Sequence, residues 1–478
     1  MTLAGRILVT ESRQLLRSRI GVGMAMLVLA SGAYGIAAGT AQMQSQAESI
    51  DALQAKESAR LEALRTATGP ATYAMSIDGD AARVVYDPPA ALSGLAVGQR
   101  DVLPFYRHVS GRTLVYDGAG IHFDGMADDI ANPERLLTGN FDLAFVLVFL
   151  VPLALIAVSY DVLSGDREAG TFALWAASGT APPAIVGWRL IGRALPLLLL
   201  SALLVVLGAL WAGAPPAAAA DVALMVVVAW AYQAWWLGMA LLLIAADRSS
   251  AVTALTLFVA YLAVTVVGPA AMGLAMDVLA PPRSHAASAL LIRDRNDALW
   301  GEIDHAAWEQ FHQAMPEVPR DAAVNLEPLL EDALGYGKKI VVWHYLMDAI
   351  ALPELDRYLS GLGRRDVMTR RVHAVAPAVL TADLLAAIAR TDVRAHLAFQ
   401  DAIRSFQAAN GRRLRALMFP GTPLSQADLP LYPAYRPPAL HPLRTDPSFL
   451  RGLATLLATT LALVSLGWWR LTCTFRPR

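Results

Sequence analysis

Residues 160–190 read YDVLSGDREAGTFALWAASGTAPPAIVGWRL and lie between two strongly apolar runs. The first half of this stretch carries charged side chains in Asp166-Arg167-Glu168, and the second half returns to apolar residues. Asp or Arg at the centre of a membrane helix costs roughly 2.5–3.5 kcal/mol, so these charges mark a boundary between helices. The stretch is therefore predicted to be a short amphipathic connection between two membrane-spanning helices.

The composition of the whole chain points to a membrane protein. Of its 478 residues, 56% are hydrophobic and 17% are charged, whereas a soluble protein averages about 25% charged residues. The formal net charge of -1, together with the absence of basic stripes, argues against a nucleic-acid partner. Cys473 is the only cysteine, which excludes an intrachain disulfide and a cysteine-based metal site.

Six apolar runs reach the roughly 20 residues that a spanning helix needs. They cover residues 20–40, 141–160, 191–212, 222–246, 251–276 and 449–469. The third to fifth runs together occupy residues 191–276, and Pro152 inside the second is expected to kink it. The first run exceeds the roughly 7–15 residue core of a signal peptide, so we favour an uncleaved anchor.

An even number of spans places both termini on one side of the membrane. Arginines gather in the flank at residues 1–19, in the connection at 161–190 and in the tail at 470–478. The positive-inside rule therefore predicts that these three segments are cytoplasmic. The flank also has helical apolar spacing, which predicts an amphipathic basic helix at the membrane surface.

Two long segments, residues 41–140 and 277–448, are then predicted to be extracytoplasmic. The first holds a helical continuation of the first span and short β-like pieces such as ARVVY at 82–86. The second has helical patterns at 306–314, 338–359 and 380–417. The predicted fold class is an α-helical polytopic membrane protein with six transmembrane helices, a small mixed α/β outer domain and a larger, mainly helical outer domain.

Motifs for enzymatic chemistry are absent from the sequence. It contains no HExxH, no GxxxxGK[ST] and no GxSxG pattern, so the chain is not expected to hydrolyse nucleotide or to be an enzyme of these classes. A weak metal candidate remains, with two E-x-x-H units that fall within about 80° of one helix face. Its members are Glu302, His305, Glu309 and His312. Such sites usually take ligands from facing helices, so we favour a solvated helix face over a metal site.

Polar side chains inside the spans are the candidates for lining a transport pathway. Gln233 and Trp236 lie in the fourth apolar run, and Thr256 and Tyr261 lie in the fifth. Packing between helices is the alternative, and we favour it for any single residue. These two runs contain no Asp, Glu, Lys or Arg, which argues against ion-coupled transport. Energy for any transport is expected to come from another protein.

The connection resembles the coupling region of the permease subunits of type-2 ABC exporters. The resemblance rests on YDVLSGDREAGT at residues 160–171, where the acidic and basic cluster and the following Gly-Thr match the family's pattern E-R-E-x-G-T. Further stretches resemble one branch, which carries a large uncharacterised domain between its fifth and sixth spans. These stretches are LAVGQRDVLPFY at 95–106, the approach to the second span at 132–145, and ARTD at 389–392.

This resemblance implies a permease subunit of an ATP-driven export complex in the bacterial inner membrane. The implied partners are a cytoplasmic ABC ATPase subunit, a second permease, the lipid bilayer and an envelope partner for the outer domains. No cofactor is expected in this chain, because ATP and Mg would be bound by the ATPase. The implied ATPase-coupling residues are Asp161, Leu163, Ser164, Gly165, Asp166, Arg167, Glu168, Gly170, Thr171 and Trp175.

The physical chemistry of the connection agrees with that implication. Apolar residues such as Leu163 and Trp175 are expected to dock in a hydrophobic groove of a partner. Three other interpretations stay open. In the first, the connection is only a solvated loop. In the second, the whole protein is a non-transporting membrane-anchored scaffold of the envelope, and in the third it is a metal-dependent envelope enzyme.

Overall fold

The computed structural model describes residues 2–66, 83–109, 116–117, 120–121, 141–173, 181–281, 290–291, 294–295, 305–314, 333–372, 376–418, 435–437, 443 and 446–475. Helices dominate these residues, and six of the helices are long and apolar enough to cross a membrane. In chain order they are α2 (Arg19–Thr66), the composite α5–η1–α6 (Leu143–Ser159), α9 (Pro182–Trp211), α10 (Ala219–Ile244), the composite α11–η3–α12 (Ser250–Leu279) and α18 (Pro447–Thr474). This confirms the predicted α-helical membrane class.

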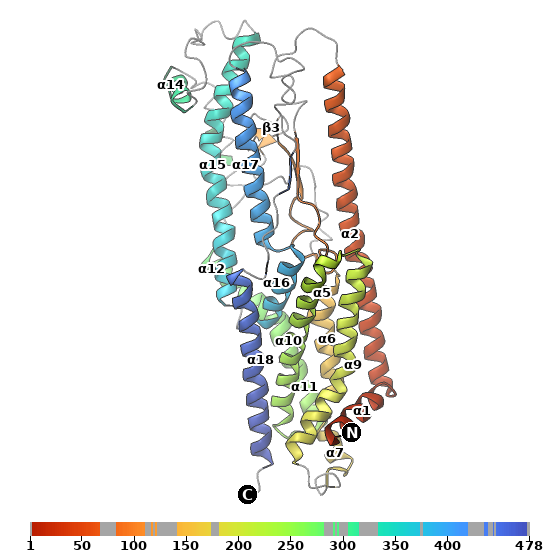
Figure 1. Ribbon diagram of the computed structural model, residues 1–478. Coiled ribbons are helices and arrows are strands. Elements are labelled where there is room, and N and C mark those ends of the chain that lie inside the picture. The colour runs from red at the N-terminus through yellow and green to blue at the C-terminus, as the bar shows by residue number, and fades with distance from the viewer. Residues whose placement is uncertain are drawn as a thin grey trace.

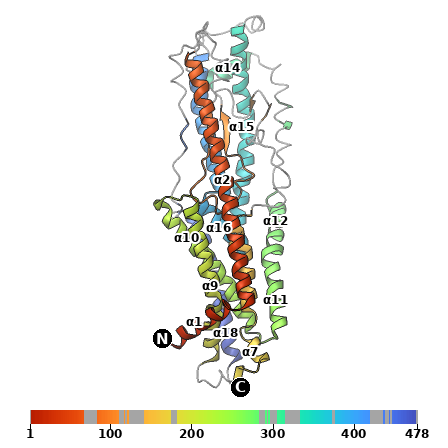
Figure 2. The same ribbon diagram turned by 90° about the vertical axis from the view of Figure 1, so that its right-hand side faces the viewer.

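Both termini lie at the same end of the bundle, which we call the proximal end (Figure 1). The short helix α1 (Leu3–Leu15) lies there beside the start of α9. Helix α2 is one continuous helix and runs past the opposite, distal end, as the sequence predicts for the first span (Figures 1 and 2).

Two of the spanning helices contain a π-helical turn directly before a proline. In the first, α5 (Leu143–Phe145) leads into η1 (Val146–Leu150) and α6 (Val151–Ser159), with Pro152 as the second residue of α6. In the second, α11 (Ser250–Leu262) leads into η3 (Ala263–Val267) and α12 (Gly268–Leu279), and Pro269 follows Gly268. Proline has no N–H to donate to the residue four positions earlier, so the wider turn accommodates it.

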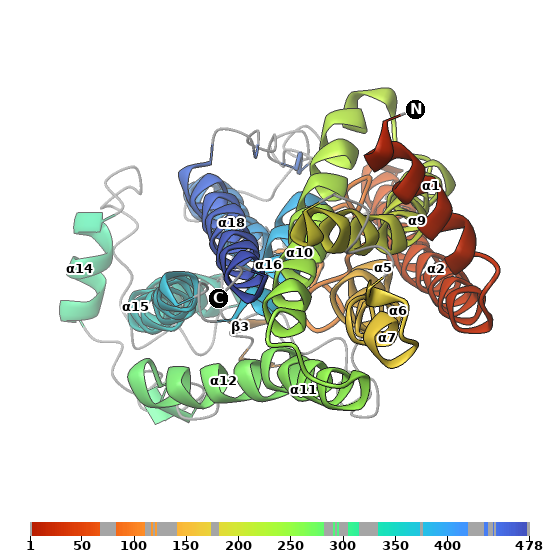
Figure 3. The same cartoon turned by 90° about the horizontal axis from the view of Figure 1, so that it is seen from below.

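Helix α10 occupies the middle of the bundle and packs against α18, α9, α6, α11 and α16 (Figure 3). Its large side chains Tyr232 and Trp236 are fully buried in the main apolar core. The composite α11–η3–α12 lies at the margin of the bundle, where most of its apolar side chains are exposed. In a membrane these side chains would contact lipid or another chain.

The region beyond the distal end is built from α14 (His305–Ala314), α15 (Ala333–Arg371) and α17 (Val393–Met418), together with short strands. Strands β1 (Arg83–Tyr86) and β2 (Tyr106–Val109) pair antiparallel, with Val84 opposite His108, and β3 (Tyr116–Asp117) pairs with β4 (Gly120–Ile121). A second apolar cluster, separate from the bundle core, joins Val85 and Val109 of the sheet to Phe311, Trp343 and Phe399 of the helices.

The predicted single helix over 380–417 is wrong, because the chain forms two helices there. Helix α16 (Pro377–Ala389) ends at Arg390, which adopts a left-handed conformation with φ 62°. The N–H groups of Arg390 and Thr391 bond to the carbonyls of Ala387 and Ala386, which closes a Schellman motif. Glycine is the usual residue at that position, so an arginine there gives the sequence no signal for a helix end.

Helix α16 returns to the distal end of the bundle and does not stay with the outer helices. It packs against α10, α18 and α5, and its Leu380, Leu384, Leu385 and Ile388 join the main apolar core. The chain then continues as α17, which runs from the distal end of the bundle into the region beyond it (Figure 1). Asp392 caps α17 by accepting the N–H of Ala395 at 3.2 Å. The large second segment is therefore anchored in the bundle by an apolar helix of 13 residues.

Candidate functional site

The connection between α6 and α9 is shorter than predicted, because α9 already begins at Pro182 and takes up residues 182–190 of the expected 161–190. At its start, Val162, Leu163 and Ser164 are buried against the bundle. The short helix α7 (Ser164–Glu168) follows, and the chain is exposed from Arg167 to Thr171. Leu163 therefore anchors the connection and does not present its side chain to a partner, whereas Trp175 lies outside the described residues.

The Gly170-Thr171 pair ends α7. Gly170 has φ 72°, and its N–H donates to the carbonyl of Arg167. The Thr171 N–H donates to the backbone carbonyl of Asp166 at 2.9 Å. These two bonds form a Schellman motif, whose left-handed residue is most easily a glycine. The Thr171 hydroxyl adds a bond to the Asp166 carboxylate at 3.1 Å. The Gly-Thr of the sequence motif therefore has a local structural role.

An ion-pair network joins α7 to α1 and α9. Glu11 of α1 is nearly buried, and its two carboxylate oxygens accept from Arg189 Nε at 2.6 Å and from Arg193 Nε at 3.0 Å. Arg189 also pairs with Asp166, and Arg193 also pairs with Asp161. Arg189 and Arg193 are one helical turn apart, so they lie on the same face of α9. The network therefore attaches the first part of the connection, from Asp161 to α7, to α9 and through α9 to α1.

A second set of contacts joins α7 to the start of α11. The Glu168 carboxylate accepts the Ser250 N–H at 2.8 Å and the Ser250 hydroxyl at 2.9 Å. The N-cap residue Ser249 makes no side-chain capping bond, so Glu168 supplies the negative charge that a helix N-terminus favours. The Ser250 hydroxyl also lies 2.8 Å from the Ser164 hydroxyl.

Arg167 extends these contacts to the end of α10 and to the C-terminal segment. Its guanidinium pairs with Asp247, which lies between α10 and α11, and stands 4.6 Å above the centre of the Phe172 ring. Phe172 in turn stacks on Phe475, with ring centroids 5.9 Å apart. Together, the contacts of α7 reach α1, α9, the α10–α11 connection and the end of α18.

Five of these partners, Glu11, Arg189, Arg193, Asp247 and Ser250, were not among the predicted site residues. Glu11 is the only acidic residue in the first 19, and it falls within a cluster of arginines, which is a signal that a search for unusual charge could have used. Arg189 belongs to the connection whose arginines predict the orientation of the chain, and Arg193 lies just inside the third apolar run. Both arginines pair with Glu11, which is more than 170 residues away from them in the chain, so no local sequence pattern indicates the pairing.

A second junction lies at the distal end and joins stretches that the sequence places far apart. The Thr391 hydroxyl donates to the Ala96 carbonyl at 2.8 Å, and the Gln99 N–H donates to the Thr391 carbonyl at 3.1 Å. Asp142, at the start of α5, accepts the Val97 N–H at 2.7 Å. These residues belong to the three stretches on which the resemblance to one exporter branch rests.

Close packing at this junction explains the glycine at position 98. Gly98 has φ 56°, and a Cβ built there would lie 2.6 Å from the Thr391 hydroxyl oxygen. Both the conformation and the lack of space disfavour any other residue. The sequence stretches 95–106 and 389–392 are therefore matched to one another in three dimensions.

The predicted pathway residues do not all lie together. Gln233, Trp236 and Tyr261 are buried between helices, with the Trp236 and Tyr261 ring centroids 5.8 Å apart. The Gln233 carbonyl oxygen accepts the Ser201 hydroxyl at 3.1 Å, and the Tyr261 hydroxyl donates to the Phe149 carbonyl at 3.1 Å. Thr256 is exposed and bonds to its own helix. Packing between helices accounts for the contacts of the three buried residues.

The weak metal candidate gains no support from the described residues. Glu302 lies outside them, as does the side chain of His305. Glu309 is exposed and lies 3.5 Å from the Gln313 amide, whereas His312 is buried beside Phe311. No group of three or more His, Cys, Asp or Glu within the described ranges is arranged to hold a metal ion.

Comparison with known proteins identifies one family. Residues 338–437, which include most of α15 and all of α16 and α17, match the family described as Domain of unknown function (DUF3526). No curated protein and no solved structure matches the chain.

Proposed function

We propose that this protein is the permease subunit of an ATP-driven ABC export complex and that α7 receives the movement of a separate ATPase subunit. The observation that carries the proposal is the position of α7. This short helix follows the second span and contacts α9 and the α10–α11 connection, and Arg189 of α9 links it to α1. Residues 167–171 are exposed. A force applied to the exposed surface would therefore act on several spans together.

The chemistry of the exposed surface supports the same role. Ala169 and Gly170 have small side chains without polar partners, so a groove of another protein can approach the backbone closely. Arg167 and Glu168 flank them, and their intrachain bonds hold the surface in place. A solvated loop would not need a capped helix with ion pairs to α9 and to the α10–α11 connection and hydrogen bonds to the start of α11.

In this proposal the proximal end faces the cytoplasm of a bacterium, and the distal region is extracytoplasmic. Two permeases, identical or related, would assemble with two ATPase subunits that bind ATP and Mg. The family match at residues 338–437 falls within the segment between the fifth and sixth spans, where the resembling exporter branch carries its large outer domain. Different contacts of α7 in the two states of the ATPase pair would drive the change between conformations.

The test is recovery of an ATPase subunit with the tagged full-length chain from its native membrane, followed by mass spectrometry of the co-purified proteins. Ala169→Arg adds bulk and charge to the exposed surface without removing an intrachain bond. We expect this variant to lose the ATPase. Ala217→Arg is the matched control, because Ala217 is an exposed alanine at the other end of the bundle, and it should retain the ATPase.

Two outcomes would overturn the proposal. Recovery of no subunit with a Walker A motif would favour the envelope scaffold, whose partners need not hydrolyse ATP. Equal recovery with Ala169→Arg and with the wild type would show that an ATPase binds elsewhere on the chain. Thermal unfolding of both variants confirms that each is folded.

A further inference from the structure

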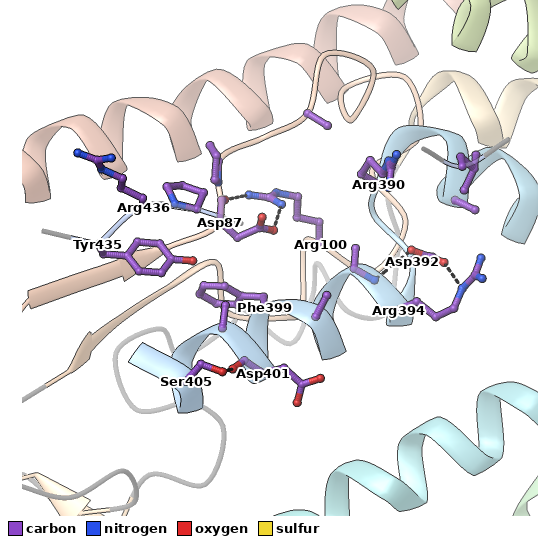
Figure 4. A pocket seen from close by; sticks show the side chains of 18 of the residues that line it. Asp87, Arg100, Arg390, Asp392, Arg394, Phe399, Asp401, Ser405, Tyr435 and Arg436 are labelled. Carbon is purple, nitrogen blue, oxygen red and sulfur yellow. Dashed lines mark hydrogen bonds and ion pairs between the residues drawn. The ribbon is translucent and has the colours of Figure 1, made fainter. Parts of the chain in front are cut away.

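The distal region contains a cavity of about 850 Å³ next to the junction of Gly98 and Thr391. It lies between the loop that follows β1, the end of α16, one face of α17 and the segment that leads into α18 (Figure 4). Ligand pockets in proteins typically measure about 300–1,000 Å³, so the cavity is large enough for a small molecule.

The charges of the described lining residues are equal in number. These residues include four arginines, Arg100, Arg390, Arg394 and Arg436, and four aspartates, Asp87, Asp392, Asp401 and Asp446. Arg100 pairs with Asp87 at 2.5 Å, and Arg394 pairs with Asp446 and, at 3.1 Å, with Asp392. The first pair closes the loop after β1 on itself, and the pair of Arg394 with Asp446 joins α17 to the start of α18. The described part of the lining therefore has no net charge with which to select a charged ligand.

The inner wall is apolar and aromatic. Phe399 is nearly buried, and the ring of Phe406 meets that of Tyr435 edge to face, with centroids 5.4 Å apart. Alanines of α17, among them Ala395 and Ala398, leave the space open in front of these rings. Covering such a wall removes apolar surface from water, which is worth about 25 cal/mol per Å².

One buried polar group in this wall has no protein partner. The side chain of Tyr435 is 9% exposed, and its hydroxyl makes no hydrogen bond within the described structure. Figure 4 shows the hydroxyl directed toward Asp87 and Phe399. Burial, reinforced by the charge of Asp87, raises the pKa of Tyr435 to about 12, so the hydroxyl keeps its proton and can donate it. An unpartnered buried hydroxyl is unusual in a folded protein.

We propose that this cavity binds an uncharged amphiphile, with its apolar body against Phe399 and Phe406 and a hydroxyl or carbonyl oxygen that accepts a hydrogen bond from Tyr435. The balanced charge favours an uncharged molecule, and the aromatic wall favours an apolar body. The place of the cavity fits a molecule that partitions into membranes, because Leu443 and Asp446 of its lining directly precede the spanning helix α18. The site does not depend on the proposed export function.

The test uses a photoreactive diazirine analogue of 1-dodecanol with the full-length chain in lipid nanodiscs. Mass spectrometry of the cross-linked peptides should place the label on the first half of α17 or on residues 435–437. Ala398→Trp fills the cavity from an exposed position on α17 and should abolish this label. Ala408→Trp, an exposed alanine of the same helix outside the lining, should leave it unchanged.

The hydroxyl and the charge preference are tested separately. Tyr435→Phe keeps the ring and removes one hydrogen bond, so the concentration of 1-dodecanol that halves the labelling should rise about fivefold. Dodecyl phosphate should compete less well than 1-dodecanol. The proposal is wrong if the label persists in Ala398→Trp, if Tyr435→Phe binds as the wild type does, or if the phosphate competes better than the alcohol. The binding measurement requires no ATPase, so its failure leaves the proposed export function untouched.

Discussion

At the scale of single residues, Glu11 has the most consequential contacts at the proximal end. It lies on a helix that the sequence predicts to rest on the membrane surface, yet its carboxylate bonds to two arginines of α9. The Ser12 hydroxyl beside it donates to the Gly192 carbonyl at 2.7 Å, which adds a bond between the same two helices. Helix α1 is therefore held by α9 as well as by any lipid, and Arg189, which pairs with both Glu11 and Asp166, couples its position to that of α7.

Replacing Glu11 by glutamine should destabilise the protein measurably. The change leaves Arg189 and Arg193 without their shared counter-charge, although each retains one aspartate. We expect a loss on the order of 2–3 kcal/mol in the free energy of unfolding, below the 3–5 kcal/mol for breaking a fully buried pair. Thermal unfolding of the purified protein measures it. Glu48→Gln, at an exposed position on α2, is the control and should change little.

At the scale of elements, the connection and α16 show what local rules do and do not reveal. The end of α7 follows from its sequence, because glycine after a short polar helix is the usual sign of a Schellman motif. Helix α16 ends in the same motif, but Arg390 takes the left-handed position that is usually a glycine. The residue types there therefore do not indicate a helix end. The burial of α16 in the bundle is likewise decided by its contacts with α10 and α18 and not by its length, which is too short for a span.

A disulfide between α7 and α11 should test whether these elements move relative to one another. The hydroxyl oxygens of Ser164 and Ser250 are 2.8 Å apart, so cysteines at both positions are close enough to bond. In a Cys473→Ser background, the double variant Ser164→Cys, Ser250→Cys should lose its free thiols on mild oxidation. If α7 transmits movement, the cross-linked protein should no longer stimulate its ATPase, and a reductant should restore the stimulation.

The single-cysteine variants, treated with the same oxidant, are the controls and should retain full stimulation. Failure of the double variant to cross-link would contradict the position of α7. A cross-linked protein that still stimulates the ATPase would show instead that α7 and α11 move as one body.

At the scale of the whole molecule, the arrangement of the six spans predicts which parts are accessible from each side of the membrane. Cys473 is exposed in the last turn of α18, and Ala217 is exposed between α9 and α10 at the other end of the bundle. A membrane-impermeant maleimide should therefore label Cys473 only in inside-out vesicles. In a Cys473→Ser background, Ala217→Cys should be labelled only in cells with an intact inner membrane. Labelling of both positions from one side would exclude the six-span topology.

The membrane class, the six apolar helices and the polar connection between the second and third helices follow from the amino-acid sequence alone. Long apolar runs can bury their backbone polar groups in a bilayer only as helices, so composition and length suffice for these conclusions. The tertiary structure alone decided the partners of the connection, the return of α16 into the bundle and the meeting of residues 95–106 with Asp142 and Thr391. Each of these depends on contacts between segments far apart in the chain, such as Glu11 with Arg189 or Ala96 with Thr391, and such contacts have no periodicity that a local pattern can reveal.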